Sequence, residues 1–142
     1  MAPDPSWLLV PHAVSSLVMV GIIWFVQVVH YPMFAHVGAL EFAAWEQRNT
    51  RLTTFVVGPP MLVEAASAAG LLVLRAGRLS LGGAVLLAVI WVSTFAIQVP
   101  AHGRLERGFD ASVHRRLVST NWIRTACWTL RGALSVVMLL RG

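Results

Sequence analysis

Four stretches of about 20 largely apolar residues constrain this chain more than any other feature of its sequence. A helix needs about 20 such residues to cross a bilayer, because the hydrocarbon is about 30 Å thick and each residue rises about 1.5 Å. The stretches predict an all-α, integral membrane four-helix bundle that residues 1–142 form as a single transmembrane domain. Their predicted bounds are about 7–34, 52–74, 79–99 and 117–140.

The composition agrees with an apolar surrounding. Hydrophobic residues make up 57% of the chain and charged residues only 12%, whereas soluble domains carry about 25% charged residues. The net charge of +5 could indicate a nucleic-acid partner. However, the arginines lie at the ends of the apolar stretches and form no basic stripe with interleaved aromatic residues. We therefore expect the lipid bilayer as partner and no nucleic acid, and a homo-oligomer is compatible with such a bundle.

The arginines also predict an orientation, because cytoplasmic connections carry an excess of basic residues. The two longer connections would then face the cytoplasm of a multi-pass protein in the cell (inner) membrane, with both termini outside. Seven arginines belong to the end of the longer connections and three to the opposite end: Arg48, Arg51, Arg104, Arg107, Arg115, Arg116 and Arg124 against Arg75, Arg78 and Arg141.

Similar polar residues occur twice at similar spacing, which predicts that the bundle is built from two similar helical hairpins. The pseudo-repeat would cover residues 7–74 and 79–140, with both copies in the same orientation. The first copy carries Gln27, His30, Asn49 and Arg51, and the second carries Gln98, His102, Asn121 and Arg124.

Polar residues recur at helical spacing on three of the four predicted spans. Steps of three and four place them on one face of each helix, and in lipid a polar face turns towards the interior of the bundle. The predicted stripes are His12, Ser16, Met19, Ile23, Gln27 and His30; Trp91, Thr94, Gln98 and His102; and His114, Asn121, Arg124, Trp128, Arg131 and Ser135.

Two histidines occupy near-equivalent places in the predicted repeat. His30 and His102 would act as general acid and base, since imidazole titrates near neutrality, or would ligate a metal. Alternatively, they are interfacial residues that bond to neighbouring polar groups. No metal or other cofactor is assumed; if haem b is bound, His12, His30 and His102 are the candidate ligands.

Amides and arginines form the candidate substrate-binding set. The amides would orient a substrate oxygen, or would simply hydrogen-bond between helices. The arginines would bind an anionic oxygen, or would extend to the interface as membrane-end arginines do. The predicted substrate-binding residues are Gln27, Arg51, Gln98, Asn121 and Trp128, and Arg124 joins His30, His102 and Glu64 as a candidate catalytic residue.

Glu64 lies deepest of the acidic residues, more than three turns into the second span. Ionisable groups inside a membrane are costly and are functional candidates by default. Glu64 has two alternatives: a structural ion pair with Arg131, or a catalytic or proton-relay role.

The segment Gln98-Val-Pro100-Ala-His102-Gly-Arg-Leu105, together with Asn121-Trp122-Ile-Arg124, resembles the anthrone-oxygenase-like family of small four-helix membrane proteins. The resemblance covers mainly residues 91–135; His102 stands where the family pattern has Asn. It implies a cofactor-independent oxygenase that acts on polycyclic aromatic substrates.

The sequence thus predicts an oxygenase- or oxidoreductase-like membrane enzyme that takes a small hydrophobic ligand into a polar pocket of the bundle. The alternatives are a haem-binding or non-catalytic accessory bundle, and a small-molecule transporter. Nucleotide and hydrolase motifs are absent from the sequence.

Overall fold

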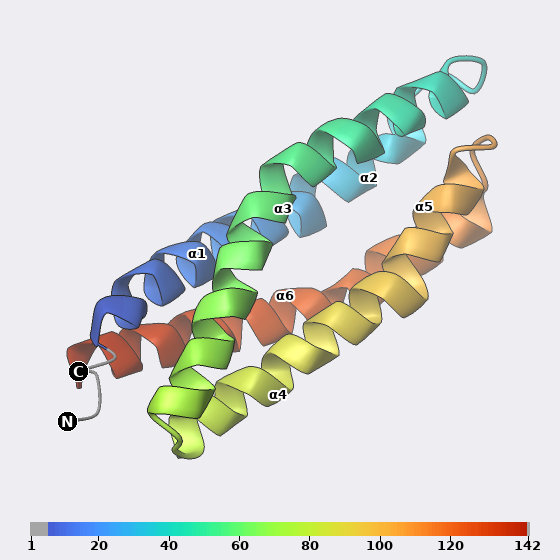
Figure 1. Cartoon of the computed structure of the whole chain (residues 1–142). Coiled ribbons are helices and arrows are strands. Elements are labelled where there is room, and N and C mark those ends of the chain that lie inside the picture. Colours follow the sequence, from blue (N-terminus) through green and yellow to red (C-terminus); the bar gives the residue numbers. More distant parts are fainter. Residues whose placement is uncertain (1–5, 142) are drawn as a thin grey trace.

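The computed structural model describes residues 6–141, and every regular element in that part of the chain is helical. Four long helical rods form an elongated bundle (Figure 1). The first rod contains α1 (Ser6–Phe25), η1 (Val26–His30), α2 (Tyr31–Met33) and η2 (Phe34–His36). The second is α3 (Phe42–Leu74); the third contains α4 (Arg78–Ser93), η3 (Thr94–Gln98) and α5 (Val99–Leu105); the fourth is α6 (Ala111–Leu140). The predicted all-α bundle of four membrane-spanning helices is confirmed.

The rods are longer than the predicted spans. They contain 31, 33, 28 and 30 residues, which corresponds to about 42–50 Å at about 1.5 Å per residue. Hydropathy marks only the part of each helix inside the hydrocarbon, which is about 30 Å thick. Residues 42–51 and 111–116, which precede the second and fourth predicted spans, are therefore helical and continuous with those spans, and they extend the bundle beyond the apolar layer.

Two five-residue π-helical turns interrupt the first and third rods. Each ends just before an X-Pro pair, Tyr31-Pro32 after η1 and Val99-Pro100 after η3. A proline ring clashes with the carbonyl four residues earlier, and the wider π turn moves that carbonyl aside. The turns place polar side chains next to a locally widened backbone, as π-bulges frequently do at functional sites. The predicted pseudo-repeat, which pairs Gln27 with Gln98, stays a prediction.

The ends and bends of the helices follow from local residue chemistry. Asp110 caps α6, because its carboxylate accepts hydrogen bonds from the N–H groups of Ser112 at 2.7 Å and Val113 at 3.1 Å. Helix α3 bends near its middle in Figure 1, in the region of Pro59 and Pro60, whose rings remove two backbone donors.

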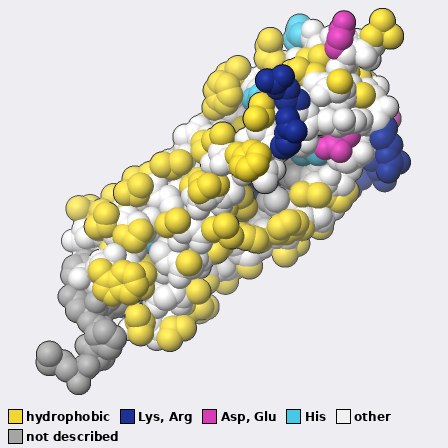
Figure 2. All heavy atoms as spheres, turned by 45° about the horizontal axis from the view of Figure 1, so that its top comes forward, with side chains coloured by type: hydrophobic (Ala, Val, Ile, Leu, Met, Phe, Trp, Pro, Cys, Tyr) yellow, Lys and Arg dark blue, Asp and Glu magenta, His cyan; other side chains and the backbone are white. Residues whose placement is uncertain are grey.

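The bundle packs unevenly. Helix α1 packs along α3 and α6, and α4 packs along α6. Helices α3 and α4 meet at a tight connection (Figure 1), and towards the other end the start of α3 contacts α5. Figure 2 shows hydrophobic side chains over the body of the molecule, whereas charged and histidine side chains gather at the end of the longer connections. The exposed apolar body is consistent with surrounding lipid.

Candidate active site

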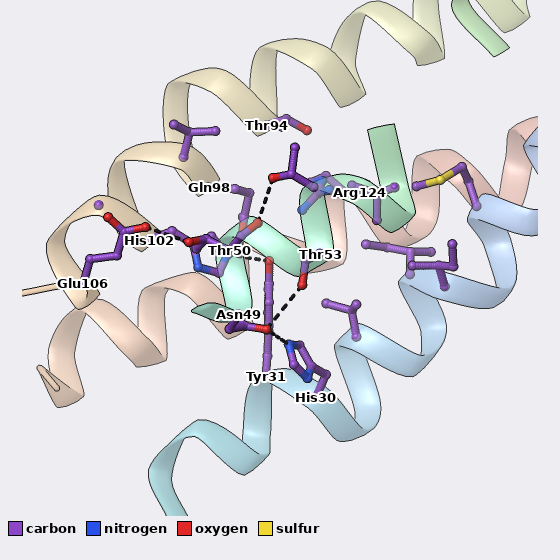
Figure 3. Close-up of a pocket in the computed structure, with 18 residues that line it drawn as sticks. His30, Tyr31, Asn49, Thr50, Thr53, Thr94, Gln98, His102, Glu106 and Arg124 are labelled. Carbon is purple, nitrogen blue, oxygen red and sulfur yellow. Dashed lines mark hydrogen bonds between the residues drawn. The ribbon is translucent and has the colours of Figure 1, made fainter. Parts of the chain in front are cut away.

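A cavity of about 350 Å³ lies between α1, η1, α2, α3, η3, α5 and α6, towards the end of the longer connections (Figure 3). Its deeper wall is apolar and includes Met19, Ile22 and Ile23. Its other wall is polar, with side chains from the first, second and third rods pointing into the same space. A mostly apolar cavity with a few convergent polar groups is typical of a small-molecule site. The polar lining residues are His30, Tyr31, Asn49, Thr50, Thr53, Thr54, Thr94, Gln98, His102, Glu106 and Arg124.

Three residues from different rods form a hydrogen-bonded chain at the polar wall. The Tyr31 hydroxyl lies 3.0 Å from Nε2 of His102, and Nδ1 of His102 lies 2.5 Å from Oε1 of Glu46. When Nδ1 carries the proton that Glu46 accepts, Nε2 is free to accept the proton of Tyr31. We call Tyr31, His102 and Glu46 the relay. Its members follow the order hydroxyl, imidazole, carboxylate. In this order the imidazole can take the hydroxyl proton and return it, while the carboxylate stabilises the imidazolium.

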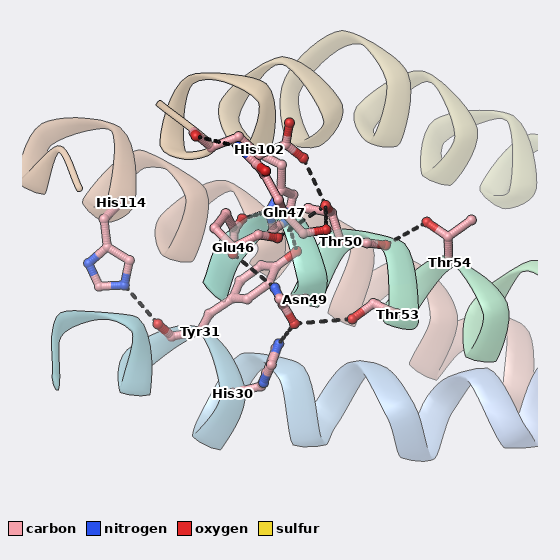
Figure 4. A network of polar contacts seen from close by, with 11 residues as sticks. His30, Tyr31, Glu46, Gln47, Asn49, Thr50, Thr53, Thr54, His102 and His114 are labelled. Atoms are coloured by element: carbon pink, nitrogen blue, oxygen red, sulfur yellow. Dashed lines mark hydrogen bonds and ion pairs between the residues drawn. The ribbon is translucent and has the colours of Figure 1, made fainter. Parts of the chain in front are cut away.

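Neighbouring side chains fix the relay in place (Figure 4). Glu46 is fully buried, and its second oxygen accepts a hydrogen bond from Nδ2 of Asn49 at 3.0 Å. Oδ1 of Asn49 lies 2.9 Å from Nε2 of His30, so His30 is joined to the same network. His114 bonds through Nε2 to the carbonyl of Tyr31 at 2.7 Å. The relay is thus braced by side chains from η1, α3 and α6.

Arg124 supplies a cation at the cavity wall. Its side chain is 7% exposed and makes no ion pair with any residue in the described range 6–141. Nη1 donates to Oδ1 of Asn121 at 3.1 Å, and Nε has no hydrogen-bond partner in that range. Asn121 in turn donates to Oε1 of Gln27 at 2.9 Å. A buried cation without a carboxylate is costly, and one beside a cavity is suited to an anionic ligand atom.

Aromatic rings close the cavity end of the bundle towards the connections. Phe34 and Phe42 are fully buried, with their ring centroids 6.2 Å apart, and Phe34 packs edge-on against Trp45 at 4.9 Å. Phe109, from the connection before α6, packs on Phe42 at 5.0 Å. Phe34 also packs against Tyr31 and His102 of the relay, and the His102 side chain remains 17% exposed.

A second polar cluster lies deeper in the bundle. Oε1 of Glu64 accepts hydrogen bonds from Nε of Arg131 and from the hydroxyl of Ser16, each at 2.8 Å. Arg131 also donates to the carbonyl of Gly83. Of the two alternatives for Glu64, the ion pair with Arg131 is therefore present. Glu64 does not line the cavity, and its catalytic or proton-relay role stays a prediction.

The other predicted residues divide into three groups. His30, His102, Gln98 and Arg124 line the cavity. Gln27, Asn121 and Trp128 are buried behind its wall, in contact with one another or with Arg124. Arg51 is exposed and lines no part of the cavity, so it is not brought to the site.

His12 lies far from His30 and His102, the other two candidate haem ligands. It bonds to Ser67 at 3.1 Å, beside the deeper cluster. From residue 12 to residue 30 the rod rises about 27 Å at about 1.5 Å per residue, so His12 cannot share an iron with His30. No group of three His, Cys, Asp or Glu side chains within residues 6–141 is arranged to hold a metal ion.

Sequence reasoning missed Tyr31, Glu46 and Asn49. Glu46 lies before the second predicted span, and its burial depends on contacts with another rod, which periodicity does not show. The signal for it was spacing: Phe42, Glu46 and Asn49 follow steps of four and three, on the face that α3 turns inwards. Tyr31 is the only tyrosine of the chain and directly follows His30, which was a second usable signal.

No family model, curated protein or solved structure matches this chain.

Proposed function

We propose that this chain is an integral membrane enzyme that removes a proton from a small hydrophobic phenol or enolisable ketone and stabilises the resulting anion. The observation that carries the proposal is the Tyr31–His102–Glu46 relay, which stands at an apolar cavity beside the buried cation Arg124. Each component has a separate part in that chemistry.

The proton would pass along the relay. Tyr31 accepts it from the ligand while its own hydroxyl proton moves to Nε2 of His102, and Glu46 stabilises the imidazolium that forms. A positioned relay of this kind contributes about 10²–10⁴-fold to a proton transfer. Arg124 then balances the negative charge on the ligand oxygen in a site with little water.

The resemblance to the anthrone-oxygenase-like family extends the proposal to oxygenation. A carbanion or enolate formed in the cavity would react with dioxygen without a cofactor. The overall change converts a ring CH₂ and O₂ into a ring C=O and H₂O, so that dioxygen is the oxidant. The chain's own contribution is to form and stabilise the anion.

The ligand would enter sideways from the bilayer. A groove of about 400 Å³ lies on the outer side of α1 and α3 and shares Ile22, Val26, His30, Thr53 and Val57 with the cavity. Its remaining lining is largely apolar and includes the exposed Phe25 and Val56. A hydrophobic molecule dissolved in lipid can follow this surface, whereas buried aromatic rings block the end of the bundle.

The same proposal places the relay near the cytoplasmic face of the membrane. Exposed arginines are more numerous at the end of the longer connections, as the positive-inside rule requires of a cytoplasmic end. They are Arg48, Arg51, Arg104, Arg107, Arg115 and Arg116 at that end, against Arg75, Arg78 and Arg141 at the other.

Purified protein in lipid nanodiscs tests the function with anthrone as substrate. We expect dioxygen consumption and anthraquinone formation above the rate of empty nanodiscs. Substitutions His102→Gln and Arg124→Gln should each reduce that excess rate by about 10²-fold. Arg51→Gln is the matched control, because Arg51 is exposed and should leave the rate unchanged. An undiminished rate in both cavity variants would overturn the assignment.

Binding of 2-naphthol provides a second measurement that does not require turnover. Its ionised form absorbs at longer wavelength than its neutral form, so the spectrum of the bound probe reports deprotonation. We expect wild-type protein to lower the apparent pKa of bound 2-naphthol, and Arg124→Gln to raise it again. Failure of the wild-type protein to bind or ionise the probe would count against the proposal.

A further inference from the structure

The deeper polar cluster contacts the active-site wall through one side chain. Trp128 is fully buried on α6, and its indole N–H donates to Oε2 of Glu64 at 3.0 Å. The ring of Trp128 also contacts Arg124, whose guanidinium carbon lies 5.1 Å from the ring centre. The cluster of Glu64 and Arg131 is therefore connected to the cavity wall by direct contacts.

The two oxygens of Glu64 have different partners. Oε1 accepts from both Arg131 and Ser16, whereas Oε2 accepts only from Trp128 among the residues described. The ion pair with Arg131 uses Oε1 alone, so it leaves Oε2 free for the Trp128 bond. That bond fixes the rotation of the indole about its side-chain torsions, and hence the direction in which the ring face points.

The position of Arg124 depends on the same ring. Steps of four and three along α6 place Arg124, Trp128 and Arg131 on one helical face. A guanidinium is attracted to the face of an indole, and this attraction is stronger in a site without water. Asn121 holds the guanidinium from one side, at 3.1 Å, and Trp128 supports it from the other.

We propose that Glu64 is a positioning residue for the active site: through Trp128 it holds the Arg124 guanidinium at the cavity wall, where a ligand anion would be stabilised. The inference rests on the proposed function in assigning a ligand anion to Arg124. It gives Glu64 a part in the site although Glu64 does not reach the cavity. The deeper cluster is then more than a structural ion pair.

The arrangement of Arg124 can be measured without a ligand. In protein with isotope-labelled arginine, NMR distinguishes an ordered guanidinium, with separate Nη signals, from a mobile one, in which they merge. Trp128→Phe keeps an aromatic ring but removes the N–H donor, so we expect the Arg124 signals to merge while those of Arg131 stay separate. Trp91→Phe is the matched control, since the buried indole N–H of Trp91 has no partner within the described residues.

Variants at Glu64 provide the complementary test. Glu64→Gln leaves one acceptor oxygen, which the charged Arg131 retains, and turns an NH₂ group towards the Trp128 N–H. Glu64→Leu removes both acceptors. We expect Arg124 to become mobile in both variants. If Glu64→Leu fails to fold, Trp128→Phe decides the question, because it leaves the Glu64–Arg131 pair intact. Separate Arg124 Nη signals in Trp128→Phe would overturn the proposal.

The 2-naphthol spectrum then separates this inference from the proposed function. If both are correct, Trp128→Phe should lower the ratio of ionised to neutral bound probe about tenfold, which is one pKa unit. It should leave the Kd of the neutral probe within about twofold, since the ring is retained. No ionisation by the wild type would overturn the function, whereas ionisation that Trp128→Phe leaves unchanged would overturn only the role of Glu64.

Discussion

The hydroxyl of Tyr31 lies 3.0 Å from Nε2 of His102, although the two residues are 71 positions apart in the chain. The contact joins the first and third rods at the level where α3 also contacts α5 through Glu46. Each residue lies close to a proline that follows a π turn, Tyr31 before Pro32 and His102 after Pro100. Local backbone chemistry in two separate rods thus brings the two side chains to one wall of the cavity.

Tyr31→Phe should abolish proton transfer without disturbing the fold. The phenyl ring keeps the packing of a residue that is 5% exposed, but the relay loses the hydroxyl between ligand and His102. We expect the excess anthrone oxidation to fall by about 10²-fold or more, with the thermal unfolding midpoint in detergent close to wild type. Activity equal to wild type would remove Tyr31 from the relay.

The fold was predictable because each span is dictated by its own residues. An apolar stretch such as 79–99 must be helical in lipid whatever it packs against, since its backbone groups have no other partner. The inward faces were also predictable, as the stripe from His114 to Ser135 shows: all six of its predicted residues are buried.

The site was only partly predictable, because its members meet through the pairing of rods. Periodicity places Arg124 on an inward face, yet it does not show that Arg124 lies beside Tyr31 while Arg51 remains exposed. Glu46 lies on a segment that hydropathy treats as a polar connection, yet it is completely buried, because its two oxygens are bonded to His102 at 2.5 Å and to Asn49 at 3.0 Å. Contacts between rods carry this information, and a single sequence does not specify them.

The buried pair of Glu64 and Arg131 should respond unequally to loss of either partner. Glu64→Leu leaves a buried guanidinium, which stays charged, and should lower the free energy of unfolding by about 3–5 kcal/mol. Arg131→Met leaves a carboxyl group that can take up a proton and still accepts from Ser16, so the loss should be smaller. The double variant should recover part of the loss of Glu64→Leu.

Unfolding of the three variants by denaturant in mixed micelles provides the comparison. Ser119→Ala is a suitable control, since Ser119 is exposed and bonds only to the backbone of its own helix. Strictly additive losses in the double variant would show that the two side chains do not interact energetically.

Val57→Trp should slow entry of a ligand from the bilayer. Val57 lines both the cavity and the groove outside α1 and α3, so a larger side chain there obstructs the passage between them. We expect the association rate of 2-naphthol in stopped-flow experiments to fall, and its dissociation rate to fall with it. Val63→Trp, at an exposed position of α3 that lines neither space, is the control. Equal rates in the two variants would place the entrance elsewhere.

The cap of α6 should give the protein a weak dependence on acid pH. Hydrogen bonds from the Ser112 hydroxyl, and then from the N–H groups of Val113 and Ser112, hold the pKa of Asp110 below its ordinary value of 3.8. A carboxylate with a lowered pKa in the folded state adds stability that is complete above 3.8 and is lost as the pH falls through the lower value. We therefore expect amide protection at Ser112 and Val113, corrected for intrinsic exchange, to be constant from neutral pH down to about 4 and to decline below it.

Asp110→Asn is the control. It retains a cap that does not titrate, so the protection of the same two amides should show no such decline. A carboxyl ¹³C titration of Asp110 with a midpoint at or above 3.8 would contradict the assignment.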